Sequence, residues 1–167
     1  MPISKKLIKF LDQTKYEPIE HKVVYTAFDK AQTMGVPEKT IGKTLVMRMN
    51  KDVALVLIPA NKNLDTKKFK RIINTQRKKS DQKLVKKISF VKESWMKKNL
   101  KGIEVGATPP FGNLWRLPTF ADKSFLKNPK IVLSAGDYDW SIKISSANFR
   151  KLIPDLILGS FGKSKKA

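Results

Sequence analysis

The chain has 167 residues and no cysteine, which excludes disulfides, thiolate catalysis and cysteine-ligated zinc. Its 35 lysines and arginines against 14 acidic residues give a net charge of +21. Such a charge favours a polyanionic partner, namely RNA, DNA or an anionic membrane, although a solubility adaptation or a general lysine bias would produce the same excess. The single histidine, His21, excludes a histidine-rich metal site and disfavours a Ser-His-Asp triad.

One domain is the expected organisation, since typical domains have about 100–150 residues. We place it at residues 1–158, followed by a flexible basic tail at 159–167. The first six residues lead into a charged helical pattern and do not resemble a signal peptide. The apolar run Val53–Ala60 is far shorter than the roughly 20 residues that span a bilayer. The expected location is therefore the cytoplasm, with no membrane partner.

The first elements are read from hydrophobic spacing and cap residues. Residues 4–13 form an expected amphipathic helix, and residues 19–25 an extended segment that is rich in β-branched side chains. A short helix is predicted to begin at Thr26 or Asp29 and to end at Gly35, which suits a left-handed helix cap.

A β-hairpin is predicted in the next part of the chain. The apolar runs Thr44–Met49 and Val53–Ile58 are separated by three polar residues, 50–52, which is a hairpin pattern. The second run has no polar interruption, so it is expected to be a central strand covered on both faces.

The remaining elements follow the same signals. Residues 103–112 cannot be helical and are expected to form a short strand that enters a rigid loop, because the segment contains glycines and two consecutive prolines. Further helices are predicted from Asp65 to about Asn74, over Glu93–Leu100 and from Ser145 or Ser146 to about Leu152, and further strands over Ser89–Val91, Leu117–Ala121, Ile131–Ser134 and Trp140–Ile144.

The positive charge is concentrated in residues 61–101, which contain 15 lysines and arginines and 3 acidic residues. A charge run of this kind is often only a solvated surface. Here it is equally compatible with a surface that follows the phosphates of a nucleic acid.

Gly42-Lys43-Thr44 raises the question of a nucleotide-binding P-loop. That motif needs a glycine five residues before the Gly-Lys pair and a helix after it. Position 37 is a proline and the segment opens a strand, so the P-loop is rejected. Lys43 remains a candidate because it lies where a loop meets a buried strand, but its spacing alone does not separate it from the other basic residues.

Two further segments could bind an anion or a developing oxyanion. Gly102–Gly112 could present backbone N–H groups or be a rigid turn without chemistry. Residues 134–137 contain small side chains that would allow a ligand to approach closely, or they form a simple hairpin turn.

His21 could act as a general base, but a lone histidine in an apolar strand is more often structural. Asp122, Asp137 and Asp139 could form an acidic site, yet a two-metal nuclease would need more carboxylates close together. Neither a metal nor a cofactor is expected.

The ordered set of motifs resembles the YbaK/prolyl-tRNA synthetase-associated (ProX-like) editing domain family over roughly residues 15–152. The motifs are His21 with Tyr25-Thr26-Ala27, Gly42-Lys43-Thr44-Leu45-Val46, Ile58-Pro59-Ala60 with Leu64-Asp65, Gly102–Gly112, Leu117-Pro118-Thr119 with Asp122, and Ser134-Ala135-Gly136 with Ile142. Some relatives have an aspartate where Ser141 stands here.

The resemblance implies an α+β fold, with a curled mixed sheet that approaches a barrel and is surrounded by helices. It implies hydrolysis of the ester bond of a mischarged aminoacyl-tRNA, with alanine or cysteine on proline-accepting tRNA first among the substrates. The partners would be the aminoacylated acceptor end of tRNA and, in addition, an aminoacyl-tRNA synthetase.

The resemblance also implies roles for individual residues. Lys43 would grip the phosphate-sugar end of the acceptor strand, and the loop from Gly106 to Pro110 would serve catalysis. The expected substrate-binding residues are His21, Thr26, Thr44, Thr108, Pro109, Phe111, Gly112, Ser134, Ala135 and Gly136.

Three other interpretations remain open. The same fold could bind tRNA without catalysis. A DNA-binding or ribosome-associated protein is disfavoured, since the chain has no helix-turn-helix signature and no aromatic RNA-stacking motif. A membrane-surface protein is disfavoured because the helix at 4–13 is short and weakly apolar.

Overall fold

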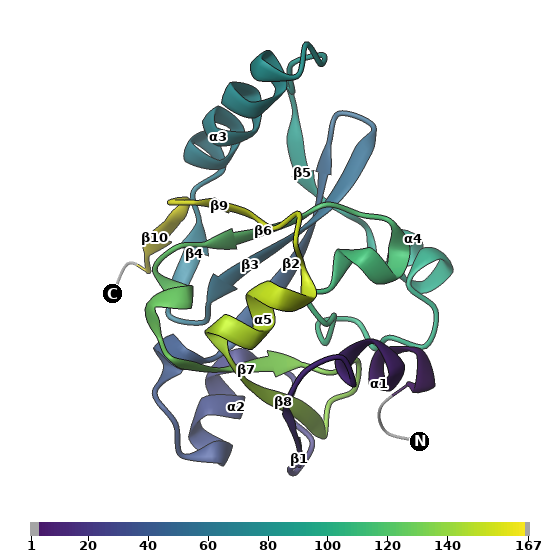
Figure 1. Cartoon of the computed structure of the whole chain (residues 1–167), viewed down its shortest axis with the longest axis vertical. Coiled ribbons are helices and arrows are strands. Elements are labelled where there is room, and N and C mark those ends of the chain that lie inside the picture. The colour runs from purple at the N-terminus through teal and green to yellow at the C-terminus, as the bar shows by residue number, and fades with distance from the viewer. Residues whose placement is uncertain (1–3, 166–167) are drawn as a thin grey trace.

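The computed structural model describes residues 4–165 as a mixed α+β fold (Figure 1). The helices are α1 (Lys5–Leu11), α2 (Ala27–Met34), α3 (Thr66–Lys79), α4 (Glu93–Asn99) and α5 (Ser146–Leu152). The strands are β1 (Glu17–Glu20), β2 (Gly42–Met49), β3 (Asp52–Pro59), β4 (Lys62–Leu64), β5 (Ile88–Phe90), β6 (Thr119–Asp122), β7 (Lys130–Ser134), β8 (Trp140–Ser145), β9 (Ile157–Gly159) and β10 (Gly162–Ser164). Within residues 4–165, no helix combines the length and apolar character that crossing a membrane requires.

The central sheet has the strand order β5-β2-β3-β6-β9. The predicted hairpin is confirmed, since β2 and β3 pair antiparallel from Gly42 opposite Pro59 to Met49 opposite Asp52. Residues 53–59 of β3 are all buried because α3 and its neighbours cover one face and the rest of the core covers the other. Alternate residues of β3 belong to these two sides: Val56 packs with Phe69 of α3, while Leu57 packs with Phe111 and Phe149.

A second sheet of three antiparallel strands, β1-β8-β7, lies against the first (Figure 1). An isolated parallel bridge between Ile41 and Val132 joins the two sheets just before β2 begins. The α+β class is confirmed. The described strands form separate sheets that do not close, so the expected approach to a barrel is not confirmed.

The helix boundaries follow their cap residues. The side chains of Ser4, Thr26, Asp65 and Ser145 each accept a hydrogen bond from the backbone N–H three residues later, which pairs an otherwise free donor at each helix start. Gly35 ends α2 with φ of 64°, as expected for a left-handed cap.

Several expected boundaries were wrong. The strand expected at 19–25 is β1 at Glu17–Glu20, and α3 continues to Lys79 instead of ending near Asn74. Residues 103–105 form no strand, and a 3₁₀ turn begins at Gly112. Polar residues 75–79 extend α3 beyond its apolar contacts, so hydrophobic spacing alone could not detect this last part of the helix.

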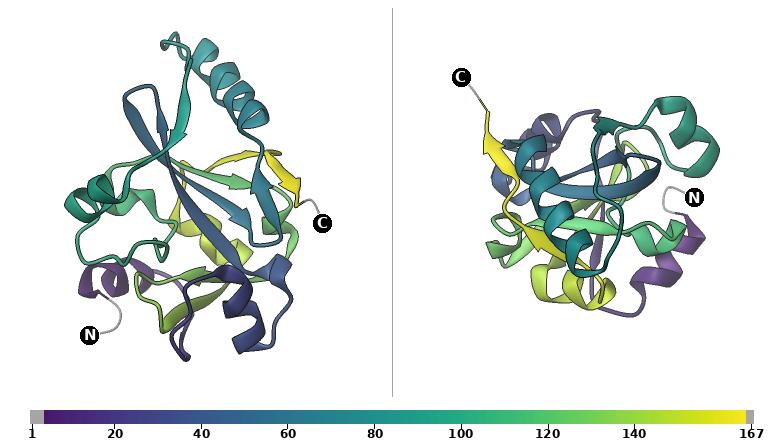
Figure 2. Two further views of the ribbon diagram at one scale, coloured as in Figure 1. Left: turned by 180° about the vertical axis from the view of Figure 1, so that it is seen from behind. Right: turned by 90° about the horizontal axis from the view of Figure 1, so that it is seen from above.

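Strand β10 lies within the segment expected to be a flexible basic tail from residue 159 onward. β10 pairs antiparallel with β4, and Figure 2 shows the yellow C-terminal end lying beside that strand. Phe161 is fully buried and its ring lies 5.3 Å from that of Phe69. The expected tail residues 166–167 lie outside the described part of the chain.

Asp122, at the end of β6, holds this segment in place. Its carboxylate accepts hydrogen bonds from the backbone N–H groups of Phe161 (3.1 Å) and Gly162 (2.6 Å). It also accepts from the N–H (2.9 Å) and the hydroxyl (2.6 Å) of Ser124. Burial raises the pKa of Asp122, but these hydrogen bonds outweigh burial and lower that pKa below its ordinary value.

Replacing Asp122 with alanine is expected to lower the free energy of unfolding by about 2–4 kcal/mol, because the substitution leaves buried N–H groups without an acceptor. Urea unfolding at pH 7 measures this change. Asp155→Ala, at an exposed aspartate, is the matched control and should change stability by less than about 0.5 kcal/mol. Equal stability of the two variants would show that Asp122 does not anchor the C-terminal strand.

Candidate active site

A cavity of about 210 Å³ lies where α2, the start of β2, the loop at Gly106 and the end of β7 meet. Its lining includes Thr26, Lys30, Lys43, Thr44, Gly106 and Ser134. A larger, more open cavity of about 780 Å³ next to Pro118 and Pro154 contains none of the residues predicted for the site. The smaller cavity is therefore the candidate site.

The fold brings five of the predicted residues together from distant parts of the sequence: Thr26, Lys43, Thr44, Gly106 and Ser134 all line the cavity. Ala135 and Gly136 follow Ser134 in the turn after β7 but are not part of the lining. Thr108, Pro109 and Pro110 are buried beyond Gly106 and do not line it either.

Phe111 and Gly112 have structural surroundings. The ring of Phe111 is fully buried between Phe10 and Phe149, with ring centres 5.2 Å and 5.8 Å away. Gly112 donates its N–H to the hydroxyl of Thr119 (2.9 Å), and a Cβ at Gly112 would lie 2.1 Å from the backbone oxygen of Leu117. These contacts explain why a phenylalanine and a glycine occupy these positions.

His21 also lies outside the cavity lining. Its Nδ1 is 2.8 Å from the backbone oxygen of Lys22 and its Nε2 is 2.8 Å from the hydroxyl of buried Ser141. A carbonyl oxygen can only accept, so Nδ1 carries a proton and donates to Lys22, while Nε2 shares a hydrogen bond with the hydroxyl of Ser141. The ring thus ties the segment after β1 to β8.

The loop at Gly106 and the turn at Gly136 support each other. The N–H of Gly136 donates to the carbonyl of Ala107 (2.8 Å), and the N–H of Glu104 donates to the carbonyl of Gly136 (2.9 Å). Gly106 and Gly136 have φ of 87° and 90°, a conformation that favours glycine. In the described part of the chain the N–H of Gly106 donates to no acceptor, so this donor is available to a ligand.

Lys43 is half-buried near the start of β2. Burial lowers its pKa, the nearby charge of Lys165 lowers it further, and Glu38 acts in the opposite direction. Glu38 pairs with Lys165 at 3.6 Å. Next to Lys43, the buried hydroxyl of Thr44 has no hydrogen-bond partner among residues 4–165. A buried polar group without a partner is rare, and this one lines a cavity that a ligand could enter.

Lys30 is a cavity residue that the sequence did not reveal. It lies on α2 with only 8% of its surface exposed, and its Nζ is 3.5 Å from the hydroxyl of Ser134. Burial lowers its pKa from 10.5 to about 8. Lys30 lies three residues after Ala27 and four before Met34, which both pack against the core, and this helical spacing was the one available signal.

Two tyrosines form another wall of the cavity. The rings of Tyr25 and Tyr138 meet edge to face with centres 4.8 Å apart, and the hydroxyl of Tyr138 donates to the carbonyl of Val105 (2.6 Å). Burial, followed by the charge of Glu104, raises the pKa of Tyr138. This tyrosine was also missed, because only the folded turn after β7 brings it to the site.

The described residues contain no group of three or more histidine or acidic side chains that could hold a metal ion. Of the aspartates considered from the sequence, Asp122 anchors the C-terminal strand and Asp137 lines the cavity. The polar groups of the cavity are therefore lysines, hydroxyls, backbone N–H groups and the carboxylate of Asp137.

Residues 21–152 match the sequence profile of the aminoacyl-tRNA editing domain. This match covers most of the chain, from His21 to the end of α5. The chain belongs to the aminoacyl-tRNA editing domain family. No curated protein sequence matches it.

Solved structures share the fold of this editing domain. Hypothetical protein APE2540 superposes with a TM-score of 0.79 at 18% identity, covering 95% of this chain and all of the other. A "putative trans-editing enzyme for prolyl tRNA synthetase" also gives 0.79 at 18% identity, with 96% of each chain covered. A Marinobacter aquaeolei protein described as acting in signal transduction gives 0.69 at 12% identity, with 96% of this chain but 31% of that chain covered.

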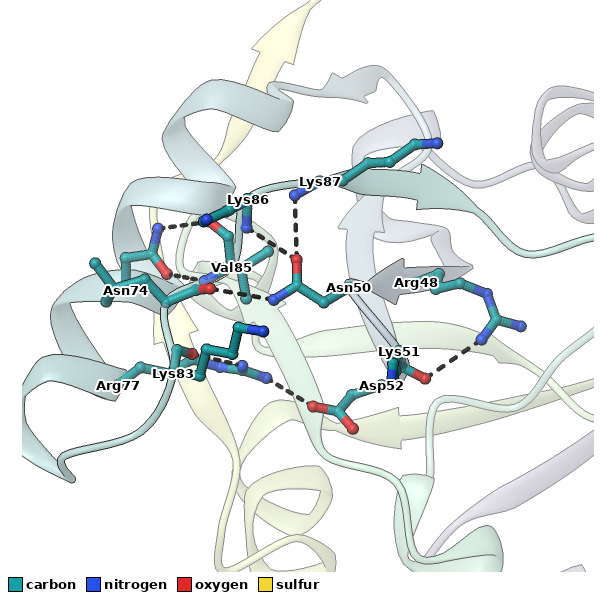
Figure 3. A network of polar contacts seen from close by, with 11 residues as sticks. Arg48, Asn50, Lys51, Asp52, Asn74, Arg77, Lys83, Val85, Lys86 and Lys87 are labelled. Atoms are coloured by element: carbon teal, nitrogen blue, oxygen red, sulfur yellow. Dashed lines mark hydrogen bonds and ion pairs between the residues drawn. The ribbon is translucent and has the colours of Figure 1, made fainter.

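Outside the cavity, the editing domain carries a basic arm, defined as residues 66–87 (α3 and the segment after it). Figure 3 shows how polar contacts fix it to the tip of the β2–β3 hairpin. Asn50 accepts from the N–H groups of Lys86 (2.9 Å) and Lys87 (3.3 Å). Arg77 donates to the carbonyl of Lys83 (2.9 Å) and pairs with Asp52 (3.1 Å). The contacts hold mainly the backbone, so most of the lysines of the arm remain exposed.

Lys30→Met is expected to increase the free energy of unfolding at pH 7, because it removes a buried charge. In the parent, folding lowers the pKa of Lys30 from 10.5 to about 8. Between these values only the unfolded state keeps the proton, so the Lys30 contribution to stability rises with pH, by up to about 3 kcal/mol.

Urea unfolding at pH 7 and pH 9.5 tests this, with Lys39→Met at an exposed lysine as the control. The parent and the control should gain stability relative to Lys30→Met as the pH rises. A constant difference between parent and Lys30→Met would mean that Lys30 titrates as an ordinary lysine.

Proposed function

We propose that this chain acts in trans to hydrolyse the ester bond of mischarged aminoacyl-tRNA. The observation that carries the proposal is the cavity in which this member of the editing family gathers Lys43, Thr44, Gly106 and Ser134. The family resemblance and the structural likeness to a protein described as a trans-editing enzyme for prolyl tRNA synthetase favour proline-accepting tRNA. Alanine and cysteine are the first amino acids to test. The reaction would take place in the cytoplasm, with a synthetase as a further partner.

Lys43 anchors the acceptor end in this proposal. A lysine that is half-buried at the start of a strand presents its ammonium in a restricted volume, and charge-assisted hydrogen bonds to phosphate oxygens are among the stronger polar contacts. The unpaired hydroxyl of Thr44 lies one residue away and is suited to a ribose or ester oxygen. Both groups gain a partner when the terminal nucleotide binds.

The backbone at Gly106 stabilises the transition state. A water molecule adds to the ester carbonyl carbon, and the carbonyl oxygen becomes an oxyanion that accepts from the N–H of Gly106. The C–O bond to the ribose then breaks, and the ribose oxygen takes the proton that the attacking water loses. The products are the free amino acid and the uncharged tRNA. The N–H of Gly136 already donates to Ala107, so the turn after β7 positions the loop and does not supply this donor.

The water is oriented by the ribose hydroxyl of the substrate itself. An aminoacyl ester is an activated bond, so its hydrolysis does not require a strong protein base.

Gly106 is required for its backbone conformation and not for packing, since a Cβ there would meet no atom within 4 Å. The alternative of a non-catalytic tRNA-binding module differs in one observable, which is turnover.

Lys43→Ala is expected to lower deacylation of mischarged tRNA by about a hundredfold or more, since it removes a charged contact to the substrate, while the fold is retained. The assay follows loss of radiolabelled amino acid from tRNA charged with alanine, cysteine or serine. Lys39→Ala removes the same charge from a nearby exposed position and should keep the parent rate. A parent-like rate for Lys43→Ala would contradict the anchoring role, and absence of turnover in the folded parent would favour the non-catalytic module.

tRNA binding is expected to weaken steeply with salt, because the basic arm contacts phosphates along the tRNA body. Each contact contributes about 0.7–0.9 to the slope of log K against log salt concentration. Replacing both Lys78 and Lys79 with alanine should reduce that slope, whereas the same change at Lys127 and Lys151, exposed on another part of the molecule, should not. Equal slopes for the two double variants would exclude the arm from the interface.

A further inference from the structure

Lys30 is the least expected residue in the candidate site. A buried lysine normally has a carboxylate partner, and here it has none. The ion pairs among residues 4–165 are Arg77 with Asp52 and Lys165 with Glu38, and burial is the sole cause of the lowered pKa of Lys30. The side chain therefore forms no ion pair with residues 4–165, and Asp137, which lines the same cavity, is not within ion-pair distance of it.

Packing does not require an amine at this position. A methionine could fill the same space on the buried side of α2 without the cost of removing a charge from water. The ammonium has three donors, and its one side-chain contact in the described protein is the 3.5 Å approach to Ser134. At least two donors thus remain for a ligand in the cavity.

The two lysines of the cavity differ in depth. Lys43 is half-buried, whereas Lys30 is 8% exposed. A substrate that places its phosphate-sugar end on Lys43 would extend its aminoacyl group toward the more deeply buried Lys30 and Ser134. The cavity volume of about 210 Å³ restricts that group to a short side chain.

We propose that Lys30 and Ser134 form a side-chain subsite that selects an aminoacyl group with a short, oxygen-bearing side chain over an alkyl side chain of similar size. The subsite rests on the proposed deacylase function and refines it. An oxygen acceptor on the substrate, from a hydroxyl or a carboxylate, completes the hydrogen bonding of the buried lysine, whereas a methyl group leaves the lysine unpaired. Serine would therefore be removed faster than alanine, the reverse of the order that the family resemblance implies.

The experiment compares kcat/KM for proline-accepting tRNA charged with serine, alanine or aspartate. For the parent, the serine-to-alanine ratio should be about ten or more, since losing the partner of a buried charged group has an effect of this size. In Lys30→Met the ratio should fall to near one. Lys39→Met, at an exposed lysine outside the cavity lining, should keep the parent ratio.

Lys30→Gln provides a second variant that keeps a hydrogen-bond donor without the charge. Its serine-to-alanine ratio should lie between those of the parent and Lys30→Met, and circular dichroism checks that each variant is folded. If Lys30→Met does not fold, an intermediate ratio in Lys30→Gln still supports the subsite, and a parent-like ratio overturns it. The aspartate-charged substrate separates recognition of a hydroxyl from recognition of a carboxylate. Removal of aspartate faster than serine would show that the subsite binds negative charge.

The possible failures are distinguishable. A parent that hydrolyses serine and alanine esters at equal rates overturns the subsite but leaves the deacylase function standing. A serine preference that survives in Lys30→Met also overturns it, and so does an equal loss of both activities, which would assign Lys30 to catalysis. If the folded parent hydrolyses none of the esters, the proposed function itself fails.

Discussion

The close approach at Gly42 is the constraint on which the candidate site depends. A Cβ at this position would lie 2.7 Å from a methyl carbon of Leu57 and 2.9 Å from the ring of Phe125. Only glycine lets the start of β2 lie against both side chains, one residue after Ile41 bridges to β7. The bridge from Ile41 to Val132 of β7 then places Lys43 and Thr44 beside the strand that ends at Ser134, and so gives the cavity two of its walls. A larger residue at position 42 would have to displace Leu57 of β3 and Phe125, which are both fully buried, at the place where the site is built.

The positive charge of the chain serves two different physical purposes. In the basic arm the lysines are exposed and their backbone is fixed by Asn50 and Arg77, so they remain hydrated and contribute an attraction that salt screens. In the cavity, Lys30 and Lys43 have lost part of their hydration, and burial lowers both pKa values. The arm can hold any polyanion, whereas the cavity favours a ligand that reaches both lysines.

Sequence reasoning succeeded where the determining forces are local. The hairpin and the left-handed cap at Gly35 follow from neighbouring residues. The role expected of Lys43 came from an ordered set of motifs and stays a prediction, although the residue does line the cavity. Sequence reasoning failed where contacts between segments distant in the sequence determine the structure. β10 exists because Asp122, 40 residues earlier, accepts from the N–H of Gly162. Lys30 is buried because α2 packs against β7, and the helical spacing of α2 was the one indication of that contact in the neighbouring residues.

The stability cost of Lys30 and the selectivity proposed for it have the same physical origin. A buried cation with few partners makes the folded state less stable. A substrate with a suitable oxygen would supply a hydrogen-bond partner to this cation when it binds, so the buried position of Lys30 favours one class of side chain. An alkyl side chain would fill the same volume without this gain. The binding preference is therefore set by what the folded protein leaves unpaired, in Lys30 as in the hydroxyl of Thr44.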